Sequence, residues 1–230
     1  MIQLYIKKLL YATTYCLFTK KKICYIIIAM DIAKILACLT DRGFIPYYID
    51  SREETINKIL SLIPKNAKVG FSGSMTVEAL NIPTILSSNG YTTYHRSIMT
   101  TYSKEDLYLL SRDADWLISS SNAVSEDGHI VNIDGKGNRV ASMIYGPKNI
   151  LIIIGINKIT LDLEQAIDRA KNIAAPLNAK RLKVGTPCTI TGKCMNCHSI
   201  ERICRATMIL TNPTFGKNFH IIIINENLGY

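Results

Sequence analysis

Residues 68–76 read KVGFSGSMT, a short apolar strand pattern that runs directly into a Ser-Gly-Ser turn and then into a helical pattern. Open α/β sheets bind ligands at this kind of position, where the carboxyl end of a strand leads into a helix. Glycine lets the backbone approach an anion, and Ser74 and Thr76 add hydroxyl donors. Gly and Ser are also ordinary turn residues. The segment therefore has two interpretations, a structural turn and an anion site formed by Gly73, Ser74 and Thr76.

Helical and strand patterns alternate on both sides of this segment. Before it, helical spacing covers 31–41, a strand pattern covers 44–49, and Ser51 and Glu54 have the spacing of a capping box. After it, a helix is predicted over 161–174 and strands over 116–119, 129–133, 150–155, 207–210 and 220–224. Residues 150–155 and 221–224 are apolar on both faces, which is typical of central strands. The alternation predicts an α/β fold with a mostly parallel, doubly wound sheet.

A second polar segment lies between two of the predicted strands. Asp127-Gly128 is a hairpin signal, and 134–138 is another turn. Turns explain the glycines and acids, but they do not explain the amides and the arginine, whose side chains can converge on a ligand. The candidate ligand-binding residues of this segment are Asn122, Asp127, Asn132, Asp134, Asn138 and Arg139. From the residues alone, a turn and a binding site are equally favoured interpretations of this segment.

Four of the seven cysteines fall close together, with the spacing Cys188-x5-Cys194-x2-Cys197-x6-Cys204. Four thiolates in one irregular loop can hold an iron–sulfur cluster or a tetrahedral zinc ion. Zinc ribbons usually contain two Cys-x-x-Cys pairs and this chain has one, so the spacing favours the cluster. Free or redox-active thiols are a third interpretation. An odd cysteine total without a credible secretory signal favours a reducing, cytoplasmic compartment.

The charge of the chain is unevenly distributed. Of its 27 basic residues, five lie within 1–29, where there is no acidic residue; the remainder holds 22 basic against 18 acidic residues, a balance of +4. So mild a balance, without a dense basic stripe, argues against nucleic-acid binding.

The first 29 residues differ in character from the rest. Their two apolar stretches are split by Lys20-Lys21-Lys22, and neither reaches the roughly 18 residues of a membrane-spanning helix. We therefore expect residues 1–29 to be a disordered or mis-annotated extension ahead of Met30. Residues 30–230 are predicted to form a single domain, with a cysteine-rich loop at 181–206 and no transmembrane span.

Taken in order, these motifs resemble a known family. The segments that carry the resemblance are Val69–Thr76, Ser121–Gly128, Asn132–Val140, Gly146–Lys148, Gly155–Lys158, Asn172–Arg181 and Pro187–Cys204. From about Met30 onward the chain resembles the single-domain lactate-utilisation (LUD) proteins with a C-terminal four-cysteine motif. The resemblance implies a fold like that of ribose-phosphate isomerase, glucosamine-phosphate deaminase and CoA-transferase, in which the strand–Gly–helix loop commonly holds a phosphate or acyl ligand.

The resemblance also implies a function. We expect a redox-linked protein of lactate or related 2-hydroxy-acid utilisation, with an iron–sulfur cluster on the four cysteines. It would bind an anionic small molecule, a carboxylate or a phosphate, and would work with other redox or iron–sulfur proteins. Two alternatives stay open: a zinc-stabilised non-catalytic subunit, and a transferase- or isomerase-like enzyme that binds an acyl or phosphate group. No catalytic acid or nucleophile stands out, so no reaction is assigned.

The chain departs from the family's usual pattern at three positions. Ser72 stands where glycine is usual, Ile200 where proline is usual, and Arg205 where asparagine is usual. These departures bear on loop shape and ligand fit more than on the cysteines, which are all present.

Overall fold

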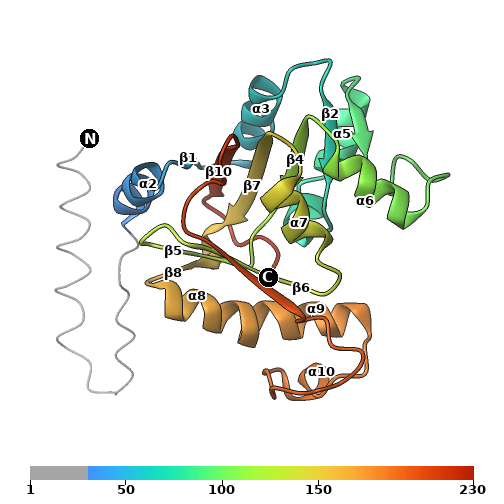
Figure 1. Ribbon diagram of the computed structural model, residues 1–230. Helices are drawn as coiled ribbons and strands as arrows, with labels where there is room; N and C mark the ends of the chain where they lie inside the picture. Colours follow the sequence, from blue (N-terminus) through green and yellow to red (C-terminus); the bar gives the residue numbers. More distant parts are fainter. Residues whose placement is uncertain (1–30) are drawn as a thin grey trace. The chain divides into compact units, whose positions relative to one another are not determined.

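A six-stranded sheet organises the computed structural model, which describes residues 31–230 (Figure 1). Its strand order is β1-β10-β7-β4-β2-β3, and every neighbouring pair is parallel. The strands are β1 (Ile45–Ile49), β2 (Lys68–Phe71), β3 (Thr92–Tyr94), β4 (Trp116–Ser119), β7 (Asn149–Gly155) and β10 (Asn218–Ile224). The prediction of a mostly parallel α/β sheet is confirmed.

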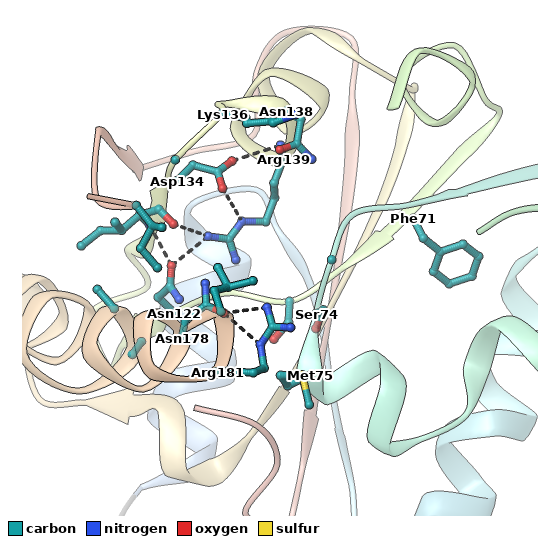
Figure 2. Close-up of a pocket in the computed structure, with 18 of the residues that line it drawn as sticks. Phe71, Ser74, Met75, Asn122, Asp134, Lys136, Asn138, Arg139, Asn178 and Arg181 are labelled. Atoms are coloured by element: carbon teal, nitrogen blue, oxygen red, sulfur yellow. Dashed lines mark hydrogen bonds and ion pairs between the residues drawn. The ribbon is translucent and has the colours of Figure 1, made fainter. Parts of the chain in front are cut away.

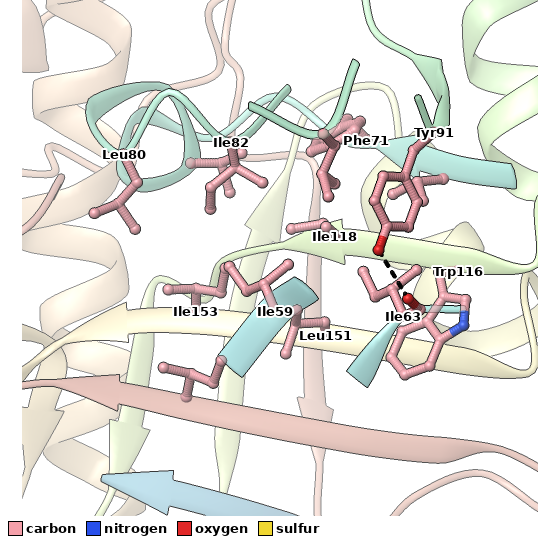
Figure 3. Packing of buried hydrophobic residues seen from close by; sticks show 14 of the residues in the cluster. Ile59, Ile63, Phe71, Leu80, Ile82, Tyr91, Trp116, Ile118, Leu151 and Ile153 are labelled. Atoms are coloured by element: carbon pink, nitrogen blue, oxygen red, sulfur yellow. Dashed lines mark hydrogen bonds between the residues drawn. The ribbon is translucent and has the colours of Figure 1, made fainter. Parts of the chain in front are cut away.

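Helices cover both faces of this sheet. They are α2 (Ile32–Asp41), α3 (Arg52–Leu62), α4 (Met75–Ala79), α5 (Ile82–Ser88), α6 (Lys104–Arg112) and α7 (Asn138–Tyr145). The helices α3, α4 and α5 pack on one face, where Ile59 and Ile82 meet Ile118 and Leu151 in the main core (Figure 3). The helices α6 and α7 pack on the other face. The doubly wound arrangement is therefore as predicted.

The two most apolar strands lie in the middle of the sheet. Ile150 to Ile154 of β7 and Ile221 to Ile224 of β10 are fully buried. A parallel strand covered by helices on both faces has no solvent side, so its residues are apolar without alternation. The predicted central strands are thus confirmed.

A second, four-stranded sheet was not predicted. Its order is β8-β5-β6-β9, formed by β8 (Ile159–Thr160), β5 (Ala123–Ser125), β6 (Ile130–Asp134) and β9 (Ala206–Leu210). The β5–β6 pair is antiparallel, and Gly128 in its turn has φ +87°, so the Asp127-Gly128 hairpin is confirmed. The predicted strand 207–210 belongs to this sheet, where it pairs with β6.

One long helical segment packs against the second sheet. It comprises α8 (Leu163–Arg169), the π-helical turn η3 (Ala170–Ala174) and α9 (Ala175–Leu182). Ala166 and Ala170 contact Ala123 and Val131 in a small core of their own. The segment continues beyond its predicted end at 174 and leads to the short α10 (Cys188–Thr191) (Figure 1).

Two further predictions concern the N-terminal extension and membrane-spanning helices. The extension predicted for residues 1–29 lies outside the described residues. Within residues 31–230, no helix is both long and apolar enough to cross a membrane.

Candidate functional site

A pocket of about 470 Å³ lies at the carboxyl edge of the six-stranded sheet. Its walls include the segments that follow β2, β3, β4 and β7, together with the start of α7, part of α9 and residues 200–205. The chain passes from β2 outward to β3 and then returns to β4 on the other side of β2. Open α/β sheets bind ligands beside such reversals, and the volume is in the range of small-molecule sites.

Six of the nine predicted ligand-binding residues line this pocket: Gly73, Ser74, Asn122, Asp134, Asn138 and Arg139. Gly73 and Ser74 follow β2 and Asn122 follows β4, and these strands are neighbours in the parallel sheet. Asp134, Asn138 and Arg139 come from the end of β6 and the start of α7.

The other three lie outside the lining. Thr76 is fully buried behind the wall, where its hydroxyl donates to the carbonyl of Leu228. Asp127 lies in the hairpin turn, with its carboxylate 3.0 Å from Nδ1 of His129. Asn132 is fully buried on β6, and its Oδ1 has no hydrogen-bond partner in the described structure.

Arg139 is held in the wall by a polar network (Figure 2). Its Nη2 donates to Oδ1 of Asn122 at 2.9 Å and to the carbonyl of Ile133 at 2.6 Å. Its Nε lies 3.9 Å from Oδ1 of Asp134 and has no hydrogen-bond partner in the described structure. Burial lowers the pKa of Arg139, and the nearby Asp134 partly opposes this effect. An arginine with an unused N–H group beside a pocket is suited to an anion.

Asp134 has a structural task as well. Its Oδ2 accepts from the backbone N–H groups of Arg139 and Val140, at 3.0 and 3.1 Å. It therefore caps α7, whose preceding residue Gly137 has φ +83° and no side chain to do so. The predicted turn at 134–138 and the predicted site share these residues.

Sequence reasoning missed Lys158 as a site residue. It lines the pocket three residues after β7 ends, and only 3% of its surface is exposed. Burial, with smaller contributions from Arg169 and Arg139, lowers its pKa to about 7. Its position after the most apolar strand was a usable signal, because that strand ends at the ligand-binding edge of the sheet.

Arg181 of α9 was also missed as a binding residue, and nothing in its sequence context marks it. Its Nε and Nη2 donate to Oδ1 of Asn178 at 3.1 and 2.8 Å, and its Nε also donates to the hydroxyl of Tyr230 at 2.7 Å. These partners are neutral, so the positive charge of Arg181 is not offset by a carboxylate in its hydrogen bonds. Figure 2 shows its guanidinium beside Ser74 and Met75.

His95 and Arg96, which follow β3, also line the pocket. His95 Nε2 lies 3.2 Å from Oε1 of Glu78, and the backbone N–H of Ser97 donates to His95 Nδ1. Burial is the largest influence on His95 and lowers its pKa, although Glu78 opposes this shift. Nδ1 as an acceptor leaves Nε2–H as the donor to Glu78, so the histidine is suited to the neutral form.

Ser72 stands where the family usually has glycine, and its hydroxyl has a hydrogen-bond partner. Its side chain is buried and donates to the hydroxyl of Ser119 at 2.6 Å, which joins the ends of β2 and β4. At the other two departures, Ile200 is 84% exposed, and Arg205 donates to the carbonyls of Arg202 and Ile200.

The cysteine loop adjoins the pocket through Arg202. This residue lines the pocket and donates to the carbonyls of Cys197 and Cys204 at 3.0 and 2.9 Å. The Cys204 side chain, by hydrogen bonding and charge, raises the pKa of Arg202, and Cys197 and Cys194 act in the same direction. Three of the four cysteines therefore influence the charge of one guanidinium.

The fourth thiol has a different partner. Cys188 Sγ lies 3.2 Å from the hydroxyl of Thr186, and all four cysteines are partly exposed free thiols. Among residues 31–230, no group of three or more His, Cys, Asp or Glu side chains is placed to hold a metal ion. The described loop does not fit a ready-made metal or cluster site, and the four-cysteine ligand set is not confirmed.

Fold and pocket together describe an α/β domain with a pocket at the carboxyl edge of a parallel sheet. A family model described as the LUD domain matches residues 32–224, and the chain belongs to this family. Membership associates the chain with lactate utilisation at the level of the family. Comparison with curated proteins found no match.

Among solved structures, the chain is similar to one titled "Crystal structure of a duf162 family protein from deinococcus radiodurans at 1.70 A resolution". Its sequence is 11% identical, and the alignment covers 85% of this chain and 99% of that one with a TM-score of 0.45.

Proposed function

We propose that this LUD domain binds a small anion, a carboxylate or phosphate compound of lactate or related 2-hydroxy-acid metabolism, in the strand-end pocket. The observation that carries the proposal is the charge of the lining. Among the described residues that line the pocket, eight are lysine or arginine and three are aspartate or glutamate. Clefts lined by one sign of charge raise the local concentration of the opposite charge and strengthen its binding.

Several of the eight cations are already paired. Lys136 lies 2.6 Å from Glu105, and Arg96 lies 3.8 Å from Glu78. Arg181, by contrast, has hydrogen bonds only to neutral groups, so its charge remains for a ligand. The volume of about 470 Å³ leaves room for an acid larger than lactate.

Calorimetric titration tests the proposal with lactate, pyruvate and phosphoglycolate as probes. We expect at least one of them to bind, and Arg181→Gln to weaken it by about tenfold to a hundredfold, the value of one charged hydrogen bond. The matched control is Arg112→Gln on α6, which removes an exposed arginine paired with Asp113, outside the pocket lining. Absence of binding by every probe, or equal losses in the two variants, contradicts the proposal.

The cofactor is a separate proposal. The cysteine spacing and the resemblance support an iron–sulfur cluster on Cys188, Cys194, Cys197 and Cys204, with zinc as the alternative and with redox partner proteins in the cytoplasm. The described arrangement does not support a preformed site, so binding would have to draw the loop together. Anaerobic purification followed by iron, sulfide and zinc analysis distinguishes these cases. If the purified protein contains no iron, sulfide or zinc, the four cysteines are free thiols.

A further inference from the structure

The amine of Lys158 is the least expected feature of the pocket wall. It is a nearly fully buried lysine, and no carboxylate within residues 31–230 forms an ion pair with it. An unpaired buried ammonium is costly, so such a group either takes up an anion or releases its proton.

Three oxygen atoms surround this amine. Its Nζ lies 2.8 Å from Oγ1 of Thr76, 3.0 Å from Oγ of Ser120 and 3.1 Å from the carbonyl oxygen of Ser121. The two hydroxyls are 3.3 Å apart and hydrogen-bonded to each other. An ammonium can donate to all three oxygens. A neutral amine can donate two bonds and accept one from a hydroxyl, so the same cage holds both forms.

The charges around the amine favour the neutral form. Arg139 of α7 and Arg169 of α8 are the charged groups that act on it, and both oppose its protonation. Thr76 of α4 and the serines after β4 are uncharged contacts. With a pKa of about 7, a large fraction of Lys158 is unprotonated at neutral pH, and an unprotonated amine is a nucleophile.

We propose that Lys158 captures the carbonyl carbon of a small 2-oxo acid as an imine. The inference deepens the proposed function and rests on it, because the cations of the pocket hold the carboxylate beside the amine. Desolvation and nearby cations keep a lysine amine unprotonated, and this activates it to form an imine with a carbonyl compound.

The step conserves atoms and electrons. The lone pair of Nζ forms a bond to the carbonyl carbon while the C=O π pair moves to oxygen, which gives a carbinolamine after a proton passes from nitrogen to oxygen. The hydroxyl then takes up a proton and leaves as water while the nitrogen lone pair forms the C=N bond, and the nitrogen releases its remaining proton. Thr76 and Ser120 can carry the proton, since their hydroxyls touch Nζ and each other. A 2-hydroxy acid has no ketone carbonyl for the amine to attack and binds without a covalent bond.

Reductive trapping tests the inference on the unaltered protein. Pyruvate and cyanoborohydride are added near neutral pH; the reagent supplies a hydride and water a proton, which fixes the imine as a stable secondary amine. Peptide mapping by mass spectrometry should find the mass of pyruvic acid less one oxygen atom on Lys158. Lys136 is the internal control, because it lines the same pocket while its hydrogen bond to Glu105 raises its pKa.

We expect at least about tenfold more adduct on Lys158 than on Lys136, since a pKa near 7 leaves far more neutral amine than an ordinary lysine has. Lys158→Arg, which keeps a long basic side chain but has no primary amine, should abolish the adduct while far-ultraviolet circular dichroism confirms folding. Equal labelling of the two lysines overturns the inference. So does absent labelling at Lys158 when calorimetry shows that pyruvate binds, and in that case the proposed function stands. Absent labelling together with no binding of any anion overturns both.

Discussion

At the scale of single residues, Lys158 links stability to pH. Its pKa of about 7 in the folded chain lies well below the ordinary lysine value, which we take for the unfolded chain. Between these two values the unfolded chain holds a proton that the folded chain has released, so stability rises with pH there and is lost as pH falls towards 7. Below pH 7 both states are protonated, and the folded chain carries a desolvated ammonium.

The corresponding prediction compares the wild type with Lys158→Met, which lacks this proton. Urea unfolding at a series of pH values should show the wild type gaining stability relative to the variant above about pH 7.5, by up to ~1.4 kcal/mol per pH unit. A difference that stays constant from pH 7 to 9.5 would mean that Lys158 keeps its proton throughout.

Single residues also show which parts of the candidate site could be predicted from the sequence and which could not. Asn122, Asn138 and Arg139 could be predicted as site residues because amides and an arginine within turns have no obvious structural use. The same logic selected Asn132, which is instead buried on β6 beside Met143. Strand side chains alternate between faces, and the sequence does not say which face borders the pocket. Lys158 could have been selected from its place after the most apolar strand. Arg181 lies on α9, and no local pattern encodes that this helix borders the pocket.

At the scale of elements, β2 and the turn after it use two glycines for different reasons. A Cβ atom on Gly70 would lie 2.5 Å from Cα and 2.7 Å from the carbonyl oxygen of Ser111, so strand and α6 are too close for a side chain. A Cβ on Gly73 would have no atom within 4 Å. Gly70 is thus needed for packing, and Gly73 is compatible with a role at the ligand.

Alanine substitutions should separate these roles. Gly70→Ala should destabilise the fold by ~1–3 kcal/mol or prevent folding, because backbone atoms of α6 cannot move aside cheaply. Gly73→Ala should change stability by less than about 0.5 kcal/mol, yet it should weaken anion binding if the backbone approaches the ligand there. Thermal unfolding and titration of both variants provide the check. A well-folded Gly70→Ala would show that the strand–helix contact is looser than described.

The helices and strands differ in how much of their structure the sequence pattern predicts. The strands β7 and β10 were predictable because burial on both faces leaves continuous apolar runs. The strand that pairs with β9 could not be predicted, because the alternation of its side chains identifies a solvent face but not the neighbouring strand. In the predicted helix at 161–174, Leu163, Ala166, Ile167 and Ala170 have helical spacing and pack together in the smaller core. Ile173 is the next residue at this spacing, but it is 47% exposed because the π-helical turn rotates the chain away from the 3.6-residue period.

At the scale of the molecule, charge is segregated. Residues 170–206 contain seven basic residues and one acidic residue, whereas the rest of 31–230 contains 15 basic and 17 acidic residues. The small excess of basic over acidic residues in 31–230 therefore comes from one strongly basic segment. Arg181, Arg202 and Arg205 of this segment line the pocket. Such a distribution attracts anions from a distance and loses strength as salt screens it.

The prediction at this scale concerns salt. The affinity for the best-binding acid should fall severalfold between about 0.02 and 0.2 M salt, because the Debye length drops to the dimensions of the pocket. The corresponding neutral amide, such as lactamide or pyruvamide, is the matched control and should bind weakly and without salt dependence. Calorimetry of acid and amide side by side measures both. Equal binding of the two would show that charge does not select the ligand.

The central claim is that a small anion binds at the carboxyl edge of the parallel sheet, and a crystal structure of the protein with pyruvate at saturating concentration tests it most directly. We predict density for the acid within hydrogen-bonding distance of a pocket cation, between the loop at Gly73 and the start of α7. Density only at another surface, or an empty pocket in crystals grown under conditions where calorimetry shows saturation, would contradict the account.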